Sequence, residues 1–374
     1  MKKIMILILV FMTAACSTAS DINSDTIDPA AQNTFEAGYY ANYKDGLFYV
    51  DMNDYSLNYL DHLDSKVYVT DVRYCDDYPY SQKQRFENYT DSLASSDIYI
   101  YDGKLFYIAV YMNAEGASSF KLYSLSVDGK ERKEIMEFRY EPTYFIIQNN
   151  LLLTVETVSS AESLIHAYRI GAKELKTITV PGIAHHLFAD GQTIYFSSDN
   201  TETGASTAYE IDTEDLACEA LLGGKDFSFV FENEKKMSYY TLNHKFTDSV
   251  KTDDIVFSSK IYDFTADSDV FAVQDEIINY FDADYIYTST LKEESMTYHI
   301  YDWDGNMVRE ITPSKDIGSS PLIVSLFGKT DASQIVRIID KKIIGYTMDD
   351  LNIQHFFACD IESGGCRVIG EQNG

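Results

Sequence analysis

The chain has 374 residues, with 59 acidic against 30 basic side chains and a formal net charge of −29. A field of this sign repels nucleic acid and anionic lipid headgroups, so we expect no nucleic-acid partner. Five cysteines in this length do not make a disulfide-dense scaffold, and none of them has the CxxC spacing of a zinc site.

Residues 1–15 have the organisation of a secretory leader. Lys2 and Lys3 precede an apolar stretch at 4–12, and small residues follow before Cys16. Nine apolar residues in helical form cover about 14 Å, roughly half of a hydrocarbon core, which is too short to span a membrane stably. We therefore expect residues 1–15 to be a signal peptide that is removed.

The sequence Thr-Ala-Ala-Cys at 13–16 resembles the bacterial lipobox, although Thr13 stands where that motif usually has Leu. The resemblance implies cleavage before Cys16, lipid attachment (diacylglycerol, palmitate) to its sulfur, and anchoring at the extracytoplasmic face of the cell membrane. Two or more acyl chains anchor a protein stably. An ordinary secretory signal with an incidental cysteine is the alternative.

Residues 16–34 are Ser, Thr, Asp, Asn and Ala with almost no large apolar side chain. Such a stretch cannot bury enough surface to order itself, so we interpret it as a flexible tether. The folded domain is expected over residues 35–370.

An internal repeat of 40 to 50 residues organises this domain. Its clearest copies are the Asp-Gly turns at 128–129 and 304–305, each between two short strands. Before each copy comes an apolar run, a polar turn, and a second run rich in Tyr, Phe and Ile. The second runs begin near Leu47, Leu105, Leu151, Ile194, Met237, Ile286 and Ile343.

Seven units of about four short strands predict an all-β fold, a β-propeller with seven four-stranded blades. Six blades is the alternative, because the unit at 227–264 is the most degenerate, and a pair of β-sandwiches would not explain a repeat kept in phase. In the second unit we expect strands at 98–101, 105–111, 120–127 and 131–138. Alternation of Tyr123 and Leu125 with Ser124 and Ser126 predicts one wetter face for the third strand.

Four strands can be found in both the first and the last unit, so no strand exchange that closes the ring is evident. Strand motifs at 47–51, 105–108 and 194–197 resemble the Tyr-Trp-Thr-Asp repeats of the low-density-lipoprotein-receptor-type propeller. With the leader, they resemble a family of Gram-positive-type lipoproteins carrying a receptor-related-protein-like propeller of unknown function. The characteristic Asp is kept only at Asp51, so the resemblance implies fold and location, and no functional residue carries over.

The insertion at 73–90 is the strongest candidate for ligand binding, because long loops on a rigid scaffold often carry function. Exposed tyrosines beside carboxylates suit sugars or peptides. A self-packed or disordered loop is the alternative. The candidate ligand-binding residues are Tyr74, Asp76, Asp77, Tyr78 and Tyr80.

Other residues predict local structure rather than chemistry. Cys359 and Cys366 flank a hairpin turn and form a disulfide if their β-carbons come within about 4.5 Å; two unbonded small residues are the alternative. His185 and His186 are expected on an innermost strand, one packing inward and one facing solvent, unless a bulge intervenes. The loop from Asp302 lacks the twelfth-position Glu of a calcium loop, so we expect a hairpin turn.

No catalytic motif and no required cofactor emerge, although calcium-dependent stability is an alternative for so acidic a chain. The sequence therefore favours a membrane-anchored, non-catalytic module that binds or scaffolds protein or carbohydrate. The alternative is a surface polysaccharide hydrolase or lyase. That reading requires two carboxylates about 5 to 10 Å apart in a central pocket.

Overall fold

The computed structural model describes residues 40–44, 46–50, 56–61, 65–71, 98–112, 118–127, 131–200, 204–225, 227–233, 235–242, 257–292, 295–313, 334–348 and 354–370. Cys16, the tether and the insertion at 73–90 lie outside these residues. The described chain is strand and turn throughout, and it contains no helix long and apolar enough to cross a membrane.

Seven four-stranded antiparallel sheets, here called blades 1 to 7, follow one another along the described chain, and consecutive strands pair within each blade. Their strands are β1 (Tyr40–Tyr43), β2 (Gly46–Val50), β3 (Ser56–Asp61), β4 (Ser65–Asp71), β5 (Tyr99–Tyr101), β6 (Lys104–Met112), β7 (Ser118–Ser126), β8 (Arg132–Phe138), β9 (Tyr144–Gln148), β10 (Leu151–Ser159), β11 (Glu162–Arg169), β12 (Glu174–Pro181), β13 (Ile183–Asp190), β14 (Thr193–Asn200), β15 (Ala205–Asp212), β16 (Cys218–Lys225), β17 (Phe227–Asn233), β18 (Lys236–Leu242), β19 (Phe257–Asp263), β20 (Ser268–Gln274), β21 (Ile277–Phe281), β22 (Ile286–Lys292), β23 (Ser295–Tyr301), β24 (Met307–Ile311), β25 (Gln334–Ile339), β26 (Lys342–Met348), β27 (Gln354–Asp360) and β28 (Cys366–Ile369).

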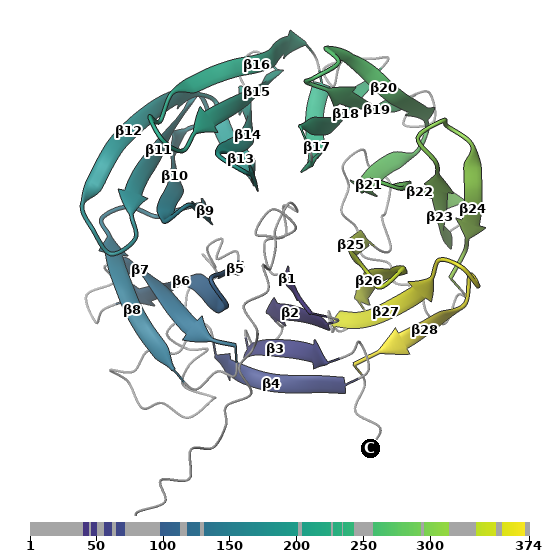
Figure 1. Ribbon diagram of the computed structural model, residues 1–374, viewed down its shortest axis with the longest axis horizontal. Coiled ribbons are helices and arrows are strands. Elements are labelled where there is room, and N and C mark those ends of the chain that lie inside the picture. Colours follow the sequence, from purple (N-terminus) through teal and green to yellow (C-terminus); the bar gives the residue numbers. More distant parts are fainter. Residues whose placement is uncertain are drawn as a thin grey trace, which may run out of the picture.

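The blades stand in a ring, with the first strand of each blade nearest the centre and the fourth at the rim (Figure 1). This arrangement confirms the seven-bladed propeller and excludes both the six-bladed count and the pair of sandwiches. The degenerate fifth unit is a complete blade, β17 to β20, and its last strand ends at Gln274 rather than near residue 264.

The repeat can be detected in the sequence because its landmark residues are buried. Each second strand begins within one residue of the predicted position. The seven landmark side chains all lie in the core, at 0 or 1% exposed: Leu47, Leu105, Leu151, Ile194, Met237, Ile286 and Ile343. Because the same strand position is buried in every blade, an apolar residue occupies it in every blade. The apolar runs therefore recur along the sequence with the period of the blades.

The strands of blade 2 fall where the alternation places them, but the prediction of a wet face on β7 is wrong at Ser124. That side chain is buried together with Tyr123 and Leu125, while Ser126 is half-buried. Each blade has another blade against both of its faces, so a small polar residue can alternate with apolar ones without reaching solvent.

Two-residue turns join the first and second strands in several blades. At 102–103, 149–150 and 340–341 both central residues have positive φ, and the strands on either side pair directly. This is the backbone of a type I′ turn, whose twist matches that of the two strands. The Asp-Gly pair at 102–103 suits this turn because Gly adopts positive φ without steric cost.

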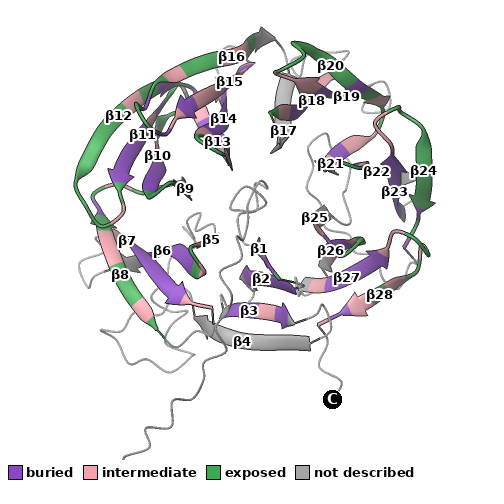
Figure 2. Cartoon of the chain, in the orientation of Figure 1, coloured by how far each residue is buried: buried purple, intermediate pink, exposed green. Residues whose placement is uncertain are grey.

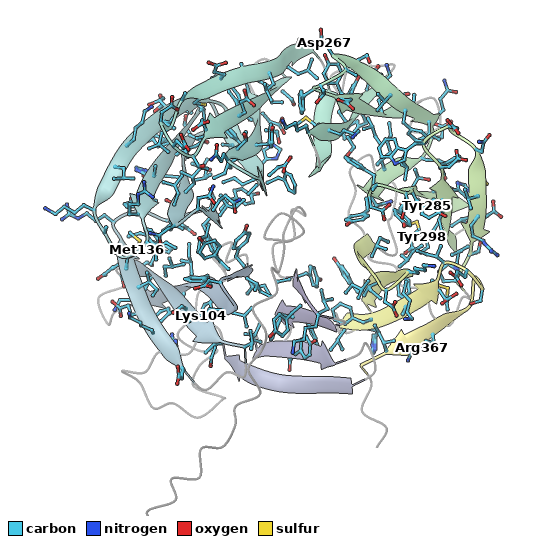
Figure 3. All side chains as sticks on the ribbon, in the orientation of Figure 1. Lys104, Met136, Asp267, Tyr285, Tyr298 and Arg367 are labelled. Carbon is cyan, nitrogen blue, oxygen red and sulfur yellow. A yellow bond between two sulfur atoms is a disulfide. The ribbon has the colours of Figure 1, made fainter. Side chains whose placement is uncertain are left out.

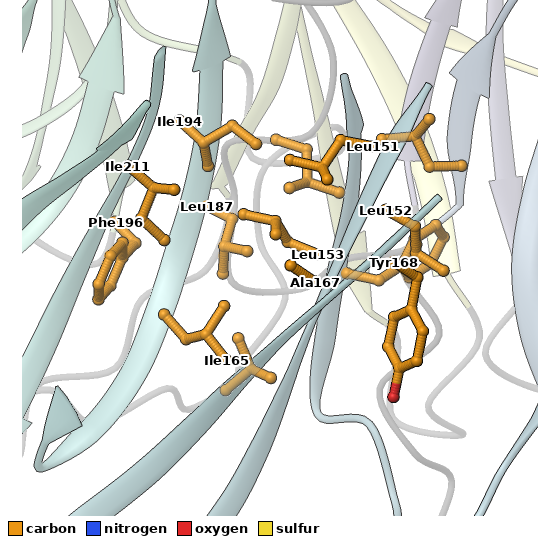
Figure 4. Packing of buried hydrophobic residues seen from close by; sticks show 14 of the residues in the cluster. Leu151, Leu152, Leu153, Ile165, Ala167, Tyr168, Leu187, Ile194, Phe196 and Ile211 are labelled. Carbon is orange, nitrogen blue, oxygen red and sulfur yellow. The ribbon is translucent and has the colours of Figure 1, made fainter. Parts of the chain in front are cut away.

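Apolar clusters fill the seams between blades, whereas the rim strands β12, β20 and β24 are mostly exposed (Figure 2). The largest cluster joins blades 2, 3 and 4, and Figure 4 shows Leu153, Ile165 and Leu187 packed within it. Side chains enter the other seams in the same way, as Tyr298 does between blades 6 and 7 (Figure 3). At about 25 cal/mol per Å² of apolar area, this burial is the main source of stability.

Hydrogen bonds at the turns add direct links between blades 2, 3 and 4. The Asn150 backbone N–H donates to the Tyr101 hydroxyl at 2.9 Å. The Gln148 and Asn149 side-chain amides donate to the Gly191 carbonyl at 2.7 and 3.1 Å. Neighbouring blades are therefore fixed relative to each other near the centre of the ring.

The ring closes by packing between blades 1 and 7. Among the described strands none pairs across this seam, because β1 to β4 and β25 to β28 form separate sheets. Aromatic contacts dominate instead: Phe356 lies with its ring centroid 4.6 Å from that of Tyr49 and 6.1 Å from that of Tyr40, in edge-to-face geometry. Leu60 and Ile369 complete the contact.

Candidate functional site

The residues predicted to bind ligand or lipid lie outside the described part of the chain, so they stay predictions. They are Cys16, Tyr74, Asp76, Asp77, Tyr78 and Tyr80. The candidate sites with visible geometry are therefore the polar clusters built into the blades.

Cys359 and Cys366 are joined by a disulfide. They are directly opposite one another in the pairing of β27 with β28, which brings their α-carbons to 4.0 Å. The intervening turn is ordered by Asp360, whose carboxylate accepts a hydrogen bond from the Ser363 backbone N–H at 2.6 Å. This hydrogen bond, together with those from the Ser363 hydroxyl and the Glu362 backbone N–H, holds the pKa of Asp360 below its ordinary value.

His185 and His186 lie on β13, the innermost strand of blade 4. The register of β13 against β14 shifts between His185 and Phe188. The strand is therefore irregular at the pair, and strict alternation of the two histidines between opposite faces is not required. The His185 side chain is buried and turns toward β14, where its Nε2 lies 2.9 Å from an oxygen of Asp199.

Ser197 completes a Ser, His and carboxylate group on β13 and β14. Its hydroxyl lies 3.4 Å from His185 Nδ1, on the side of the ring away from Asp199. Asp199 also accepts a hydrogen bond from the Ser206 hydroxyl. These residue types in this order activate a serine nucleophile in hydrolases when the serine is accessible.

Burial excludes that chemistry here. Ser197 is completely buried, and its hydroxyl is shared between the ring of His185 and the backbone carbonyl of the same residue. A nucleophile must be able to approach the substrate within about 3 to 3.5 Å. The group therefore acts as an internal connection between the two inner strands of blade 4.

A second cluster surrounds His166 on β11 in blade 3. Its Nε2 lies 2.9 Å from an oxygen of Glu156 on β10, and its Nδ1 lies 3.0 Å from an oxygen of Glu174 on β12. The ring of Tyr140, from the connection between blades 2 and 3, stacks on the imidazole at 4.2 Å between centroids. Tyr140 also shares a hydrogen bond with the Tyr168 hydroxyl at 2.8 Å.

Blade 6 contains the same arrangement around His299 on β23. Its Nδ1 lies 2.8 Å from Glu276, in the connection before β21, and its Nε2 lies 3.1 Å from Glu310 on β24. The Tyr301 hydroxyl donates to Glu276 at 3.0 Å, and Thr288 donates to the same carboxylate. Burial and the Glu276 charge raise the pKa of Tyr301.

In both clusters the imidazole lies between two carboxylates, one at each ring nitrogen. A glycosidase places its two carboxyl groups on either side of the scissile bond. Here the imidazole occupies the intervening space, so neither described pair can perform that reaction. Because the ring nitrogens point apart, their partners cannot converge on one ion. Within the described residues no group of three or more His, Cys, Asp or Glu is placed to hold a metal.

The sequence analysis missed these clusters, although the repeat carries a signal for them. The third strands of blades 3 and 6 contain His-x-Tyr, at 166–168 and 299–301, and those of blades 2 and 5 contain Lys-x-Tyr, at 121–123 and 260–262. In all four blades the Lys or His side chain pairs with a carboxylate of the fourth strand, at 2.9 to 3.1 Å.

A bulge on the fourth strand accompanies this pairing. The register between third and fourth strands shifts by one residue next to the same tyrosine in all four blades: Tyr123, Tyr168, Tyr262 and Tyr301. Bulges re-aim a side chain locally. The pairs of a Lys or His with a carboxylate are therefore a repeated structural feature of these four blades.

The loop from Asp302 is a hairpin turn between β23 and β24, as predicted. Its carboxylate accepts hydrogen bonds from the Asn306 side-chain amide at 3.0 Å and backbone N–H at 2.8 Å, which hold the pKa of Asp302 below its ordinary value. Gly305 adopts a φ of +82°. The carboxylate is committed to the turn.

Comparison with known proteins identifies the fold. No protein-family model matches the sequence, and no curated relative is found by sequence. The structure is similar to the β-propeller domain of the Trilobed protease from Pyrococcus furiosus, with a TM-score of 0.51 and 13% identity over 90% of this chain and 99% of that one. That propeller is described as having an open velcro topology.

The structure is also similar to the acylaminoacyl peptidase of Pyrococcus horikoshii, with a TM-score of 0.54 and 12% identity over 90% of this chain. The match covers 53% of the peptidase, so this chain spans about half of its length. At these identities the likeness shows the β-propeller fold alone.

Proposed function

We propose that the protein is a lipid-anchored, extracytoplasmic β-propeller that binds a protein or glycan ligand without catalysing a reaction. One observation supports the absence of catalysis: the polar side chains of the described clusters are paired with one another inside the blades. The serine of the Ser197 group is buried, and the carboxylates around His166 and His299 are paired with imidazoles.

The extracytoplasmic location is supported by two independent features. The expected leader, residues 1–15, is followed by Cys16 in a lipobox-like sequence. The disulfide between Cys359 and Cys366 suits an oxidising compartment, since cytosolic thiols are kept reduced. A bacterial lipoprotein related to receptor-like propellers would have both features.

Lipid attachment is tested by metabolic labelling with a palmitate analogue. The full chain is expected to incorporate the label and to partition with membranes, and Cys16→Ala is expected to lose both properties. Cys218→Ala is the matched control, because it removes a cysteine of the folded domain and should label normally. Labelling that survives in Cys16→Ala would overturn the anchor.

Ligand binding is tested with the full chain, purified in detergent, on glycan and peptide arrays. Binding should be lost when Tyr74, Tyr78 and Tyr80 are replaced by Ala and retained when exposed Met307 and Val308 on β24 are replaced. Hydrolysis of a glycan or peptide by the purified protein, abolished by a single substitution, would contradict the non-catalytic function. Binding that ignores the tyrosines would move the ligand site away from the insertion.

Calcium binding is a separate proposal that rests on acidity alone. If thermal unfolding in millimolar calcium matched unfolding in chelator, the proposal would be wrong.

A further inference from the structure

The closing seam of the ring depends on the last and shortest part of blade 7. Strand β28 has four residues, whereas the rim strands β12 and β16 have eight each. Its last residue, Ile369, is buried in the seam with blade 1. The seam therefore depends on holding a short edge strand in place.

Gly370, which directly follows β28, fits closely against blade 1. It has a φ of +73°, and a β-carbon added there would lie 2.6 Å from a methyl carbon of Leu60. Leu60 is completely buried. The end of the described chain is thus in direct contact with the first blade, with no space for a larger residue.

The disulfide ties the other end of β28 to the interior of blade 7. It joins Cys366, the first residue of β28, to Cys359 on β27. Cys359 is completely buried in the cluster between blades 6 and 7, on the opposite side of the blade from the seam with blade 1. One covalent bond therefore fixes the closing strand to the side of blade 7 that packs on blade 6.

We propose that the disulfide between Cys359 and Cys366 is a redox-sensitive clasp that closes the propeller, in which none of the described strands pairs across the seam between blades 1 and 7. When it is intact, β28 is held on β27 and presents Ile369 to blade 1. When it is reduced, β28 separates from β27 more often, and blade 1 loses its contact with Ile369 and Gly370.

The opening reaction requires an external dithiol. Its thiolate attacks the sulfur of half-buried Cys366, forming a mixed disulfide and releasing Cys359 as a thiolate that takes up a proton. The second thiol of the reductant, as a thiolate, then attacks the reductant sulfur that is bonded to Cys366. This step releases Cys366 as a thiolate, which takes up a proton. Two electrons and two protons pass to the protein, and the reductant becomes a disulfide.

Hydrogen exchange with mass spectrometry, on the full chain with and without dithiothreitol, tests the clasp. We expect exchange on the order of ten-fold faster in β1, β3 and β28 after reduction, by the usual effect of opening a short disulfide loop. Strands β11 and β12 of blade 3 are the internal reference and should not change.

Two variants separate the clasp from other effects of the reductant. The double variant Cys359→Ser, Cys366→Ser should exchange like the reduced protein and should not respond to dithiothreitol. Cys218→Ala should respond like the natural sequence. Should the double variant fail to fold, reduction of the native protein still decides the matter. Faster exchange in every blade alike, or unchanged exchange in β1 and β3, would overturn the proposal.

Discussion

Replacing His299 by Leu tests whether the paired carboxylates stabilise the ring. The side chain of His299 is 3% exposed and that of its partner Glu276 is 12% exposed, so the substitution leaves a nearly buried carboxylate without its imidazole partner. Removing one partner of a buried ion pair costs about 3 to 5 kcal/mol. Because Tyr301 and Thr288 still donate to Glu276, we expect the lower end, about 3 kcal/mol.

His166→Leu is the matched control, because it removes the same side chain from the equivalent strand of blade 3. Its partners, Glu156 and Glu174, have side chains 29% and 40% exposed and can be solvated after the change. We expect a loss of about 1.5 kcal/mol, the value of one hydrogen bond to a charged group. The ranking of the two variants follows from the exposure of their carboxylates.

Urea unfolding followed by far-UV circular dichroism measures both variants over the whole domain, and the single tryptophan adds a probe of blade 6. Trp303 lies in blade 6 and donates from its indole N–H to the Asp282 carbonyl at 3.0 Å, so its fluorescence reports the blade that contains His299. Adding Glu276→Gln to His299→Leu should recover about 1 to 2 kcal/mol by removing the unpaired charge. Equal losses in the two histidine variants, or no recovery in the double variant, would refute the reasoning.

Three further predictions concern acid stability, thiol reactivity and the closing seam. Burial opposes ionisation of Glu174, but hydrogen bonds from a neighbouring threonine and from His166 outweigh burial and lower the pKa of Glu174. The ionised Glu174 therefore stabilises the folded protein at pH values above the ordinary pKa of a glutamate. This stabilisation is lost as the pH falls through the lowered pKa. Urea unfolding from pH 6 to pH 3 should therefore show a smaller loss of stability in Glu174→Gln than in the natural sequence, and parallel curves would contradict this. Burial raises the pKa of Cys218 to about 11, so iodoacetamide at pH 8 should label it far more slowly in the folded than in the urea-unfolded protein; equal labelling rates would show that the thiol is accessible. Gly370→Ala should destabilise the domain by about 1 to 2 kcal/mol more than Gly364→Ala, because both have positive φ but only Gly370 lacks space for a methyl group; equal effects would mean that the seam gives way without cost.

The repeat and the blade count could be predicted because they depend on local features. Leu47, Met237 and Ile343 occupy the same buried position in their blades, so the pattern survives even in the degenerate fifth unit. The Asp-Gly turn at 102–103 could be predicted because positive φ restricts the residue type. Both features are determined by residues within a single hairpin.

The candidate sites depend on contacts between segments that the sequence does not pair. Glu276 reaches His299 from the connection before its blade, and His185 reaches Asp199, which lies opposite Ile183 on the neighbouring strand. In a chain with 59 acidic residues, no spacing rule selects Glu276 as the partner. Such pairings become visible only when strands and connections are placed in space.

The sequence by itself determined the all-β propeller, its seven repeats and the positions of its strands, because strand burial and turn conformation act over a few residues. The tertiary structure decided that both faces of a blade are buried, that Ser197 is inaccessible, and that Phe356 and Ile369 pack across the closing seam, where none of the described strands pairs. The physical reason is that burial and closure belong to the packing of one blade on another. A side chain is buried by its neighbour across the seam, and that neighbour lies far away in the sequence.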